Sequence, residues 1–393
     1  MGGLKQKKSL KIAIFSWESI YTDRVGGLSN ATTYLAQSLA KYHEVHFFTR
    51  GGTDFTLANV HYHTWNPSGS NIIEYCNNLS YGLLSRFYEY DNDKPFDILH
   101  FNDWHLVEAF HQLQDRNCVF SYHSTEYGRN GNIYGDWWEY HEISGKEWYC
   151  GIMAKVCTVV SETLQQEVMD LYKIPKEKLY VIPNGIIIEQ FDVCIDTANV
   201  KQRYGIHYLA PLILYIGRLA YQKGPDIFVQ AIPMIRDHRW DVQAIVAGGG
   251  GMYDHLKGLA YGNPVQVIGF IQDTEYVRLL NAADIVVIPS RNEPFGIVLL
   301  EAWSAGKPVV VSNVGGLSEN VTDYITGIKV DCTPEGIAWG VNWYLSHPHE
   351  MGKIGMKGQS EVQSYSWDII ADRMMYMYRS ILPAEFNVSN VTL

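Results

Sequence analysis

Arg218 and Lys223 lie in one short glycine-bounded segment, Gly217-Arg-Leu-Ala-Tyr-Gln-Lys-Gly224, which directly follows an apolar run. A guanidinium can hold a phosphate through two parallel hydrogen bonds, and a flexible ammonium can neutralise its charge. The segment also leads into a helical pattern, and the free N–H groups of a helix N-terminus attract anions. The pair is therefore a candidate diphosphate site, although two cations at this spacing are commonly only solvated surface residues.

Two carboxylates stand eight residues apart in the segment Asn292-Glu-Pro-Phe-Gly-Ile-Val-Leu-Leu-Glu301, which again follows an apolar run. Pro294 and Gly296 suit the first turn of a helix whose N-terminal amides face a ligand. We expect Glu293 to precede that helix and Glu301 to lie about two turns into it. Carboxylates at this spacing are common by chance, but the Pro-Phe-Gly turn between a strand and a helix makes this pair a stronger candidate.

The first half of the chain holds further candidates in turns. Gly26 and Gly27 fall in the segment Ser16–Ser29, where the backbone can approach a ligand closely and a helix begins. His123 stands at the carboxyl end of an apolar run, where an imidazole could bind a sugar hydroxyl or transfer a proton. For Gly26 and Gly27 the ordinary alternative is a tight turn, and for His123 it is a buried structural histidine. Two interpretations of the aromatic stretch Tyr127–Trp148 also stay open, namely carbohydrate contact and a packed lid.

Short apolar runs alternate with amphipathic stretches along the chain, which is typical of parallel sheets with helices on both faces. The alternation pauses at residues 192–209 and then restarts, so we expect two Rossmann-like domains joined near residues 186–210. A length of 393 residues agrees, because a single core rarely grows that large. The expected strands are Lys11–Phe15, Val45–Phe48, Ile98–Phe101, Val119–Tyr122, Val156–Val160, Tyr180–Ile182, Leu212–Ile216, Val242–Ala247, Val265–Ile268, Ile285–Ile288 and Val309–Val311. The expected helices include Ser29–Leu39, Glu162–Tyr172, Pro225–Ile235, Glu275–Ala282 and Gly296–Ala305.

Composition and charge exclude several classes of function. The net charge of -11 argues against a nucleic-acid binder, because phosphate-backbone affinity comes from clustered Lys and Arg. No apolar stretch reaches the roughly 18 residues of a membrane span, and the first residues lack the apolar stretch of a signal peptide. The six cysteines show no metal-ligand spacing. We therefore expect a cytoplasmic protein without stable membrane insertion and without a metal site; its oligomeric state stays open.

Taken together and in this order, these segments resemble family 4 of the glycosyltransferases, a large GT-B group that includes sucrose synthases and sucrose-phosphate synthases. The pair Glu293 and Glu301 is similar to the E-x7-E signature of that family, and the segment from Arg218 to Lys223 is similar to its G-R-x4-K-G loop. The resemblance covers nearly the whole chain and is more specific in the second half.

The resemblance implies an α/β protein of the GT-B type, with two doubly wound domains that face each other across a cleft. Residues 1–190 would form the acceptor domain and residues 205–365 the nucleotide-sugar donor domain, with a C-terminal helix near residues 366–386 packing back on the first. The implied activity is retaining and metal-independent transfer of a hexose, with glucose favoured, from a nucleoside-diphosphate sugar, with UDP favoured. No cofactor is implied beyond this donor. The acceptor is a carbohydrate or small molecule that the sequence does not identify.

The resemblance also assigns roles to residues. Arg218 and Lys223 would neutralise the donor diphosphate, Glu301 would accept hydrogen bonds from the ribose, and Glu293 would hold the transferred sugar by its hydroxyls. His123 would contact that sugar from the first domain. The amides that complete the anion site would be those of Gly27, Gly296, Ile297 and Val298. The expected acceptor-side residues are Asp103, Glu126 and Arg129. Front-face substitution, in which the leaving phosphate oxygen takes the acceptor proton, is favoured over Glu293 as a nucleophile.

Two alternatives stay open. The segments Arg24-Val-Gly-Gly-Leu28 and Asn102-Asp-Trp-His105 resemble glycogen and starch synthases, which would make the chain an α-glucan elongating enzyme. Those enzymes have Lys where Arg24 stands and His where Asn102 stands, which weakens that assignment. The other alternative is a sugar-nucleotide-binding subunit that keeps the fold without catalysis.

Overall fold

The computed structural model describes residues 9–383, and this part of the chain divides into two compact units. The first unit comprises residues 9–127, 134–185 and 367–383, and the second comprises Gly128–Ile133 and Ile186–Ser366. Residues 1–8, on which the expected absence of a signal peptide rests, lie outside the described residues, as do the last residues of the helix expected at 366–386. Each unit is described below by itself.

The first unit contains an eight-stranded sheet in the order β3-β4-β2-β1-β5-β6-β7-β8. Neighbouring strands run parallel, except that β3 and β4 form an antiparallel edge. The sequence pattern does not predict these two strands, because β3 has only three residues and histidines interrupt the apolar run of β4. The strands are β1 (Lys11–Phe15), β2 (Glu44–Arg50), β3 (Phe55–Leu57), β4 (Val60–Trp65), β5 (Ile98–Asn102), β6 (Cys118–Tyr122), β7 (Val156–Val159) and β8 (Leu179–Val181).

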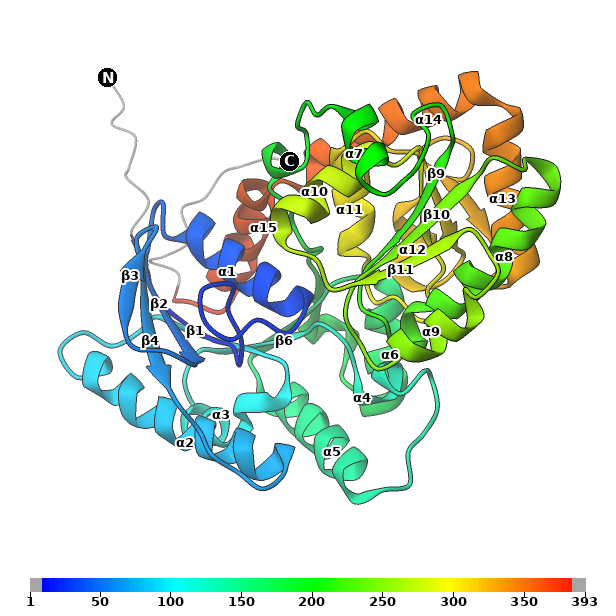
Figure 1. Cartoon of the computed structure of the whole chain (residues 1–393). Helices are drawn as coiled ribbons and strands as arrows, with labels where there is room; N and C mark the ends of the chain where they lie inside the picture. Colours follow the sequence, from blue (N-terminus) through cyan, green and yellow to red (C-terminus); the bar gives the residue numbers. More distant parts are fainter. Residues whose placement is uncertain (1–8, 384–393) are drawn as a thin grey trace, which may run out of the picture. The chain divides into compact units, whose positions relative to one another are not determined.

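Helices cover the sheet of the first unit, and the C-terminal helix α15 is one of them. Figure 1 shows α15, in red, beside α1, and the two helices are in contact. Trp367 begins α15, and a Cβ added to Gly185 would lie 2.6 Å from its ring, so the indole occupies the space that this glycine leaves. The helices are α1 (Gly27–Leu39), α2 (Ile72–Asp91), α3 (Val107–Leu113), α4 (Glu126–Arg129), α5 (Trp138–Met153), α6 (Glu162–Tyr172) and α15 (Trp367–Ser380), where α4 ends within the segment grouped with the second unit.

The second unit contains a six-stranded sheet in the order β11-β10-β9-β12-β13-β14, and all its strands run parallel. The strands expected from the apolar runs are confirmed to within a residue at each end, while β14 is not predicted because Lys329 interrupts its three residues. A strand that is covered by helices on both faces needs apolar residues throughout, which is why these runs are readable from the sequence. The strands are β9 (Leu212–Ile216), β10 (Gln243–Ala247), β11 (Val265–Gly269), β12 (Ile285–Ile288), β13 (Val309–Ser312) and β14 (Ile328–Val330).

The helices of the second unit pack on this sheet around a core that includes Phe228, Ile232 and Tyr344. They are α7 (Thr197–Arg203), α8 (Pro225–His238), α9 (Tyr253–Leu259), α10 (Asp273–Ala282), α11 (Ile297–Ser304), α12 (Gly315–Asn320), α13 (Pro334–Ser346) and α14 (Pro348–Glu361). Short 3-10 turns in the two units are η1 (Trp104–Leu106), η2 (Lys176–Lys178), η3 (Ile188–Gln190), η4 (Tyr221–Lys223) and η5 (Val362–Tyr365).

Both sheets have a point at which the direction of strand addition reverses. In the first sheet, β1 leads to β2 on one side and β5 lies on the other, so the reversal falls between β1 and β5. In the second sheet, β9 leads to β10 on one side and β12 lies on the other. The loops that follow the two strands at such a point diverge and leave a crevice at the carboxyl edge, which is where open α/β sheets bind ligands. Each unit therefore has one place where a ligand is expected first.

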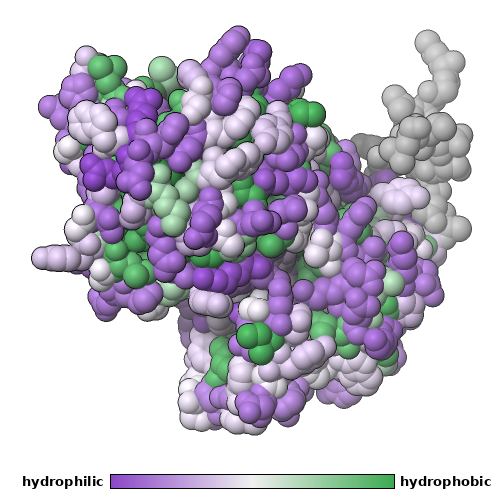
Figure 2. Space-filling view, turned by 90° about the vertical axis from the view of Figure 1, so that its right-hand side faces the viewer, coloured by the Kyte–Doolittle hydropathy of each residue, from purple (hydrophilic) through white to green (hydrophobic). Residues whose placement is uncertain are grey.

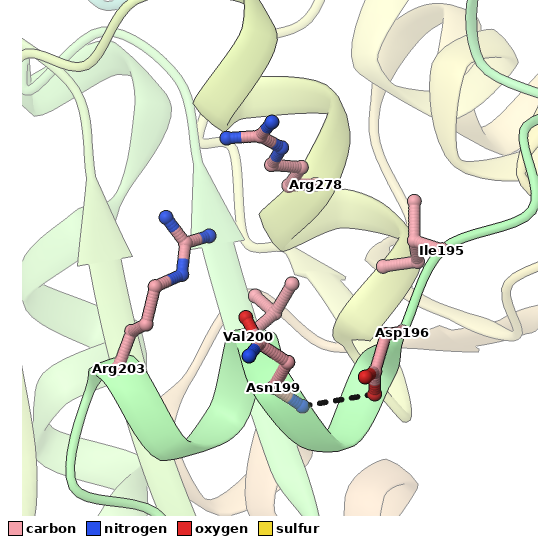
Figure 3. A pocket seen from close by; sticks show the side chains of 6 residues that line it. All are labelled: Ile195, Asp196, Asn199, Val200, Arg203 and Arg278. Carbon is pink, nitrogen blue, oxygen red and sulfur yellow. Dashed lines mark hydrogen bonds between the residues drawn. The ribbon is translucent and has the colours of Figure 1, made fainter.

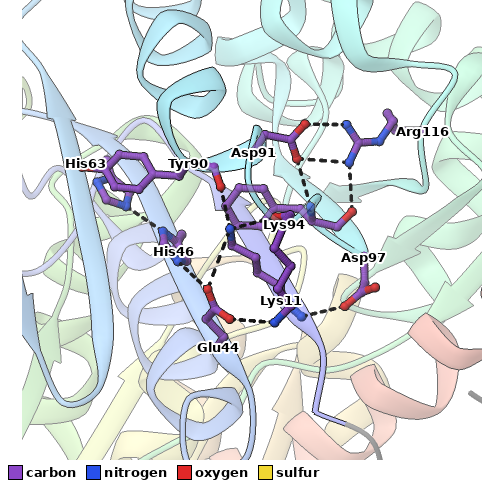
Figure 4. A network of polar contacts seen from close by, with 10 residues as sticks. Lys11, Glu44, His46, His63, Tyr90, Asp91, Lys94, Asp97 and Arg116 are labelled. Carbon is purple, nitrogen blue, oxygen red and sulfur yellow. Dashed lines mark hydrogen bonds and ion pairs between the residues drawn. The ribbon is translucent and has the colours of Figure 1, made fainter.

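The opposite, amino edge of the first sheet is held by a network of polar contacts (Figure 4). Lys11 begins β1, and its ammonium donates to the backbone oxygens of Tyr90 and Lys94. Glu44 begins β2 and lies 3.3 Å from His46 Nε2, while His46 Nδ1 lies 2.8 Å from His63 Nε2. These groups satisfy one another's hydrogen-bonding capacity within the first unit, so we assign them a role in the stability of the fold.

The surface drawn in Figure 2 carries small hydrophobic spots separated by hydrophilic residues. On that face the hydrophobic residues do not gather into one wide band. Within residues 9–383, no helix is both long enough and apolar enough to cross a membrane.

Candidate active site

The loop after β9 and the loop after β12 are locked together at the reversal point of the second sheet. Gly224 closes the first loop with φ +64, and a Cβ added there would lie 2.0 Å from the carbonyl oxygen of Pro289. Only a glycine permits this approach of the two backbones. Gln222 adds two links, because its backbone oxygen accepts from Arg291 N at 2.8 Å and its Nε2 donates to Asn292 Oδ1 at 3.3 Å. The two loops thus hold each other in place at the carboxyl edge of the sheet.

An ion pair between Lys223 and Glu293 joins the same two loops. The ammonium of Lys223 lies 2.7 Å from Glu293 Oε1 and 2.8 Å from Oε2. Ser290 Oγ donates a further hydrogen bond of 2.9 Å to Oε2. The Glu293 side chain is 9% exposed and that of Lys223 is 25% exposed, so the carboxylate is held inside while the ammonium reaches the opening. The structure therefore brings together two residues that the sequence places 70 positions apart.

Arg218 lies on the same loop as Lys223. Its Nη2 donates to Gln222 Oε1 at 3.1 Å, and its backbone oxygen accepts from the Tyr215 hydroxyl at 2.8 Å. Gln222 therefore links Arg218 on one side to Asn292 on the other. Arg218, Lys223 and Glu293 form one continuous polar wall, and its two cations suit a diphosphate while its carboxylate suits hydroxyl groups.

The backbone of Glu293 is held by the turn after β13. A Cβ added to Gly315 would lie 2.1 Å from the Glu293 carbonyl oxygen, and Gly316 N donates to that oxygen at 2.8 Å. A side chain at position 315 would displace Glu293, and φ there is +49. The segment Val314-Gly-Gly therefore positions Glu293 without contributing a side chain.

Helix α11 begins later than expected. Gly296 is its N-cap, with φ +100, and Ile297 is its first residue, so Pro294 precedes the helix and is not part of its first turn. Glu301 is the fifth residue of α11, which places it one turn into the helix and not two. The amides expected from Gly296, Ile297 and Val298 do lie at this N-terminus, next to Glu293, whose Cγ would be 3.6 Å from a Cβ on Gly296.

Glu301 is buried beside a tyrosine of the neighbouring helix. Its carboxylate accepts a short hydrogen bond from the Tyr276 hydroxyl on α10, and the residue is 6% exposed. Tyr276 in turn lies against Phe191, at 6.3 Å between ring centroids. This geometry holds one carboxylate oxygen in place, as required of an acceptor for ribose hydroxyls.

His123 follows β6 at the carboxyl edge of the first sheet. Asn102 Nδ2 donates to Phe15 O at 3.2 Å, which turns its Oδ1 toward His123 Nε2 at 3.0 Å. Because that oxygen can only accept, we assign the proton of the imidazole to Nε2 and leave Nδ1 as an acceptor. Burial lowers the pKa of His123 to about 4, so the ring is neutral near pH 7. Such a ring can accept a hydrogen bond from a sugar hydroxyl but is a poor acid.

Asp103 lies directly beside His123. Its Oδ1 accepts from His123 N at 2.9 Å, and Asp103 N donates to Ser121 O at 3.0 Å. Asp103 adopts φ +56, a conformation that few non-glycine residues take and that clusters at functional sites. The structure thus brings Asp103 and His123 together at the reversal point of the first sheet. That they join Glu293 and Lys223 in one active site remains a prediction.

The turn after β1 contains an internal carboxylate that the sequence analysis does not single out. Glu18 Oε2 accepts from Val25 N at 2.5 Å and from Gly26 N at 2.9 Å. Burial is the main cause that raises the pKa of Glu18. Gly27 is the first residue of α1 and directly follows these two amides. Glu18 thus shapes the turn in which the predicted anion-binding amide of Gly27 lies.

Glu126 and Arg129 begin and end the short helix α4. Glu126 N donates to Glu147 Oε2 at 2.9 Å, and Glu147, 1% exposed, also accepts from the Tyr172 hydroxyl. The buried carboxylate in this region is therefore Glu147, on α5, and its role is to hold the start of α4. The acceptor-side roles of Glu126 and Arg129 remain predictions.

The sequence analysis misses four residues that shape these sites: Glu18, Gln222, Ser290 and Tyr276. Gln222 lies inside the predicted Arg218–Lys223 loop, and Ser290 lies two residues before the predicted carboxylate segment, so proximity in sequence is a usable signal for both. Tyr276 carries no such signal, because only folding brings α10 beside α11.

A separate cavity of about 310 Å³ lies between α7 and α10 of the second unit (Figure 3). Its two cations are Arg203 and Arg278, and Arg203 Nη2 already lies 3.0 and 3.1 Å from the carboxylate oxygens of Glu275. None of the predicted site residues lines this cavity. The candidate active site is therefore the carboxyl edge of the second sheet around Lys223 and Glu293.

Comparisons with known proteins agree with this geometry. Residues 196–360 match the family described as Glycosyl transferases group 1, and residues 25–190 match Glycosyltransferase Family 4. An uncharacterised glycosyltransferase of Methanocaldococcus jannaschii is 34% identical over 94% of this chain and 98% of its own length. The chain is a family 4 glycosyltransferase. A glycogen synthase of Mycobacterium tuberculosis is also similar to this glycosyltransferase, with 30% identity over 72% of the chain and 68% of the relative.

Solved structures confirm the GT-B fold of this glycosyltransferase. The sucrose-phosphate synthase of Thermosynechococcus elongatus superposes with a TM-score of 0.79, at 22% identity, over 95% of this chain and 99% of that one. Anabaena HepE in complex with UDP-glucose superposes with a TM-score of 0.74, at 18% identity, over 95% of this chain and all of that one. At these identities the likeness shows the fold alone. The expected α/β class and the expected family are thus both confirmed.

Proposed function

We propose that this glycosyltransferase moves a hexose, with glucose favoured, from a UDP-sugar to an acceptor hydroxyl with retention of anomeric configuration. The observation that carries the proposal is the Lys223–Glu293 pair, which joins the β9 and β12 loops. It combines a cation for the diphosphate with a carboxylate for sugar hydroxyls at a single point. That Anabaena HepE binds UDP-glucose on the same fold supports the choice of donor.

Charge neutralisation is the main task in such a transfer, because negative charge develops on the departing diphosphate. Arg218 and Lys223 stand on one loop and supply two positive charges without a metal ion, aided by the amides at the N-terminus of α11. We therefore propose metal-independent catalysis without a cofactor other than the donor. Full activity after treatment with EDTA tests this point, and loss of activity that Mg²⁺ or Mn²⁺ restores would contradict it.

Retention needs either a nucleophile or attack from the face of the leaving group. Glu293 is the carboxylate predicted to hold the sugar, but both its oxygens are committed to Lys223 and one also to Ser290. A carboxylate so neutralised is a weak nucleophile. We therefore propose front-face substitution, in which a phosphate oxygen of the departing diphosphate takes the acceptor proton.

The direct test is a donor and acceptor screen followed by an NMR time course. Thermal shifts with UDP-, ADP- and GDP-sugars select the donor, and a panel of acceptors is then tried with it. We expect UDP-glucose to stabilise the protein most and the first product to carry an α-linkage. An inverted product would overturn the retaining mechanism, and stabilisation by ADP- or GDP-sugars alone would overturn the donor assignment.

A second candidate function is elongation of an α-glucan. The similarity to the M. tuberculosis glycogen synthase favours it, as do the segments around Arg24 and Asn102. Maltooligosaccharides of increasing length in the acceptor panel separate the two candidates. An elongating enzyme would produce a ladder of longer glucans, whereas a transferase with a small acceptor would stop after one addition.

A further inference from the structure

A buried arginine lies at the carboxyl edge of the first sheet, outside the predicted site residues. Arg50 is the last residue of β2, the strand next to β1, and it is 9% exposed. Its Nη1 donates to the Tyr75 hydroxyl at 3.2 Å. Its Nε is buried and has no hydrogen-bond partner within the described part of the chain. A buried guanidinium edge without a hydrogen-bonded partner is costly and calls for a functional explanation.

The guanidinium is held rigidly by a stack of rings. Its central carbon lies 3.9 Å from the centroid of the Trp17 ring, which in turn stacks on His105 at 4.2 Å and 9°. His105 stacks on Trp104 at 4.4 Å, and Trp104 is 3% exposed. Trp17 is therefore covered on both faces and cannot serve as a platform for a sugar ring. It instead orients Arg50 beside the loop that carries Asp103.

One acidic side chain reaches the unsatisfied edge without making a hydrogen bond. Asp23 Oδ2 lies 3.8 Å from Arg50 Nε, and the Asp23 side chain is 53% exposed. Its carboxylate lies over Gly51, where an added Cβ would be 2.9 Å from Asp23 Cγ. This half-exposed carboxylate makes no hydrogen bond to Arg50 Nε, so a better-matched anion from solvent can replace it. Glu18 is also near but is committed to two backbone amides.

We propose that Arg50 binds an oxyanion on the acceptor, either a phosphate ester or a carboxylate, and that Asp23 competes for the same edge. The edge formed by Nε–H and Nη2–H matches such groups with two parallel hydrogen bonds. The inference rests on the proposed function and deepens it by naming an anionic acceptor. The donor has its own cations in the other unit, Arg218 and Lys223, so the buried Arg50 at the carboxyl edge of the first sheet is available for the acceptor.

Turnover with UDP-glucose tests the proposal on four acceptors: glucose 6-phosphate, glucuronate, glucose and maltotriose. We expect transfer to one of the two anionic sugars, and which of them is used separates phosphate from carboxylate recognition. Arg50→Gln should raise the KM for that acceptor by about 10- to 100-fold, the loss expected for charge-assisted hydrogen bonds. Asp23→Asn should lower the same KM several-fold, because the competing carboxylate is gone.

One further variant and the sign of the Asp23→Asn effect control the experiment. Arg373→Gln removes an exposed guanidinium from α15 of the same unit and should leave the KM unchanged. Because Arg50 is buried, Arg50→Gln could fail to fold, whereas Asp23 is half exposed and its variant should fold normally. The opposite sign of the Asp23→Asn effect is a result that a merely structural role of Arg50 does not produce.

The outcomes separate this inference from the proposed function. Transfer to glucose or maltotriose with the same KM in wild type, Arg50→Gln and Asp23→Asn would overturn the anion site while leaving the glycosyltransferase assignment in place. Calorimetric titration with glucose 6-phosphate and with glucuronate, with the second unit saturated by UDP, gives a readout without turnover. Binding of either probe that Arg50→Gln weakens and Asp23→Asn strengthens supports the site even if no UDP-sugar is consumed, and equal binding in all three proteins overturns it.

Discussion

Lys223 and Glu293 neutralise each other where the loops after β9 and β12 meet, although their predicted roles are to hold different parts of the donor. The ammonium contacts both carboxylate oxygens, at 2.7 and 2.8 Å. A diphosphate that binds Lys223 therefore has to share this ammonium with Glu293, and its own negative charge lies close to the carboxylate. The pair thus sets a balance between donor affinity and the positioning of the sugar.

This balance predicts that one substitution at Glu293 raises the affinity for UDP and lowers kcat. Glu293→Gln removes the competing charge, so we expect UDP to bind several-fold more tightly, as measured by calorimetry. The same variant loses the carboxylate that holds the transferred sugar, so kcat with UDP-glucose should fall by about 10²- to 10³-fold. Glu361→Gln, an exposed change at the end of α14, is the matched control and should alter neither value. Weaker binding of UDP to Glu293→Gln would contradict the competition.

A second prediction concerns the close approach of the β9 and β12 loops. Gly224→Ala places a Cβ 2.0 Å from the carbonyl oxygen of Pro289 at φ +64, so we expect the free energy of unfolding to fall by about 2 kcal/mol or more. Gly258→Ala is the control, because Gly258 lies in helix α9 with no atom within 4 Å of an added Cβ. That change should be neutral or stabilise the protein by up to about 1 kcal/mol. Equal denaturant midpoints for the two variants would contradict the steric argument.

The sequence predicts those parts of the fold whose burial is continuous along the chain. Strand β1 and helix α6 have the bounds that the apolar pattern predicts, because all residues of β1 are buried and α6 buries one regular stripe. Strand β3 is largely exposed and Lys329 interrupts β14, so neither leaves a readable apolar run. Helix α2 is not predicted for a different reason: its 20 residues include polar and aromatic positions that obscure the helical periodicity of apolar residues.

The candidate site likewise has features that the sequence predicts and features that only the fold creates. Arg218, Lys223 and Glu293 are predictable because each stands in a strand-to-helix turn with a recognisable sequence motif. Their mutual contacts are not predictable, since they depend on the loops after β9 and β12 meeting at a reversal point of strand order. Arg50 leaves no signal at all, because its partner Trp17 lies on a neighbouring strand's loop.

A third prediction concerns the pH dependence of catalysis. Burial lowers the pKa of His123 to about 4, so His123 stays neutral throughout the range from pH 5.5 to 8. We therefore expect His123→Gln to lower kcat/KM while leaving the shape of its pH profile unchanged over that range. The measurement is kcat/KM for the donor at half-unit intervals in both proteins. An acidic limb near pH 6.5 that is present in wild type and absent in His123→Gln would show that the histidine titrates as a free imidazole and would contradict the assignment.

The last prediction is acid sensitivity of the first unit, caused by His46 and His63. Burial is the main cause that lowers the pKa of each to about 4, and for His46 the neighbouring His63 lowers it further. The opposing groups, Glu44 beside His46 and Asp54 beside His63, do not restore the pKa of either histidine to its usual value. The folded protein thus keeps both rings neutral at pH values where the unfolded chain, with pKa values near 6.5, has already bound protons.

The sign follows from proton binding. Because the unfolded chain binds more protons between pH 6.5 and 4, the stability from these histidines is fully present above pH 6.5 and is lost as the pH falls toward 4. The slope is at most about 1.4 kcal/mol per pH unit for each histidine. Urea midpoints at pH 7.5 and 5.0 should therefore differ more in wild type than in the double variant His46→Gln, His63→Gln. His349→Gln, an exposed change on α14, should behave as wild type. An equal acid-induced loss of stability in the double variant would show that groups other than these two histidines cause the acid sensitivity.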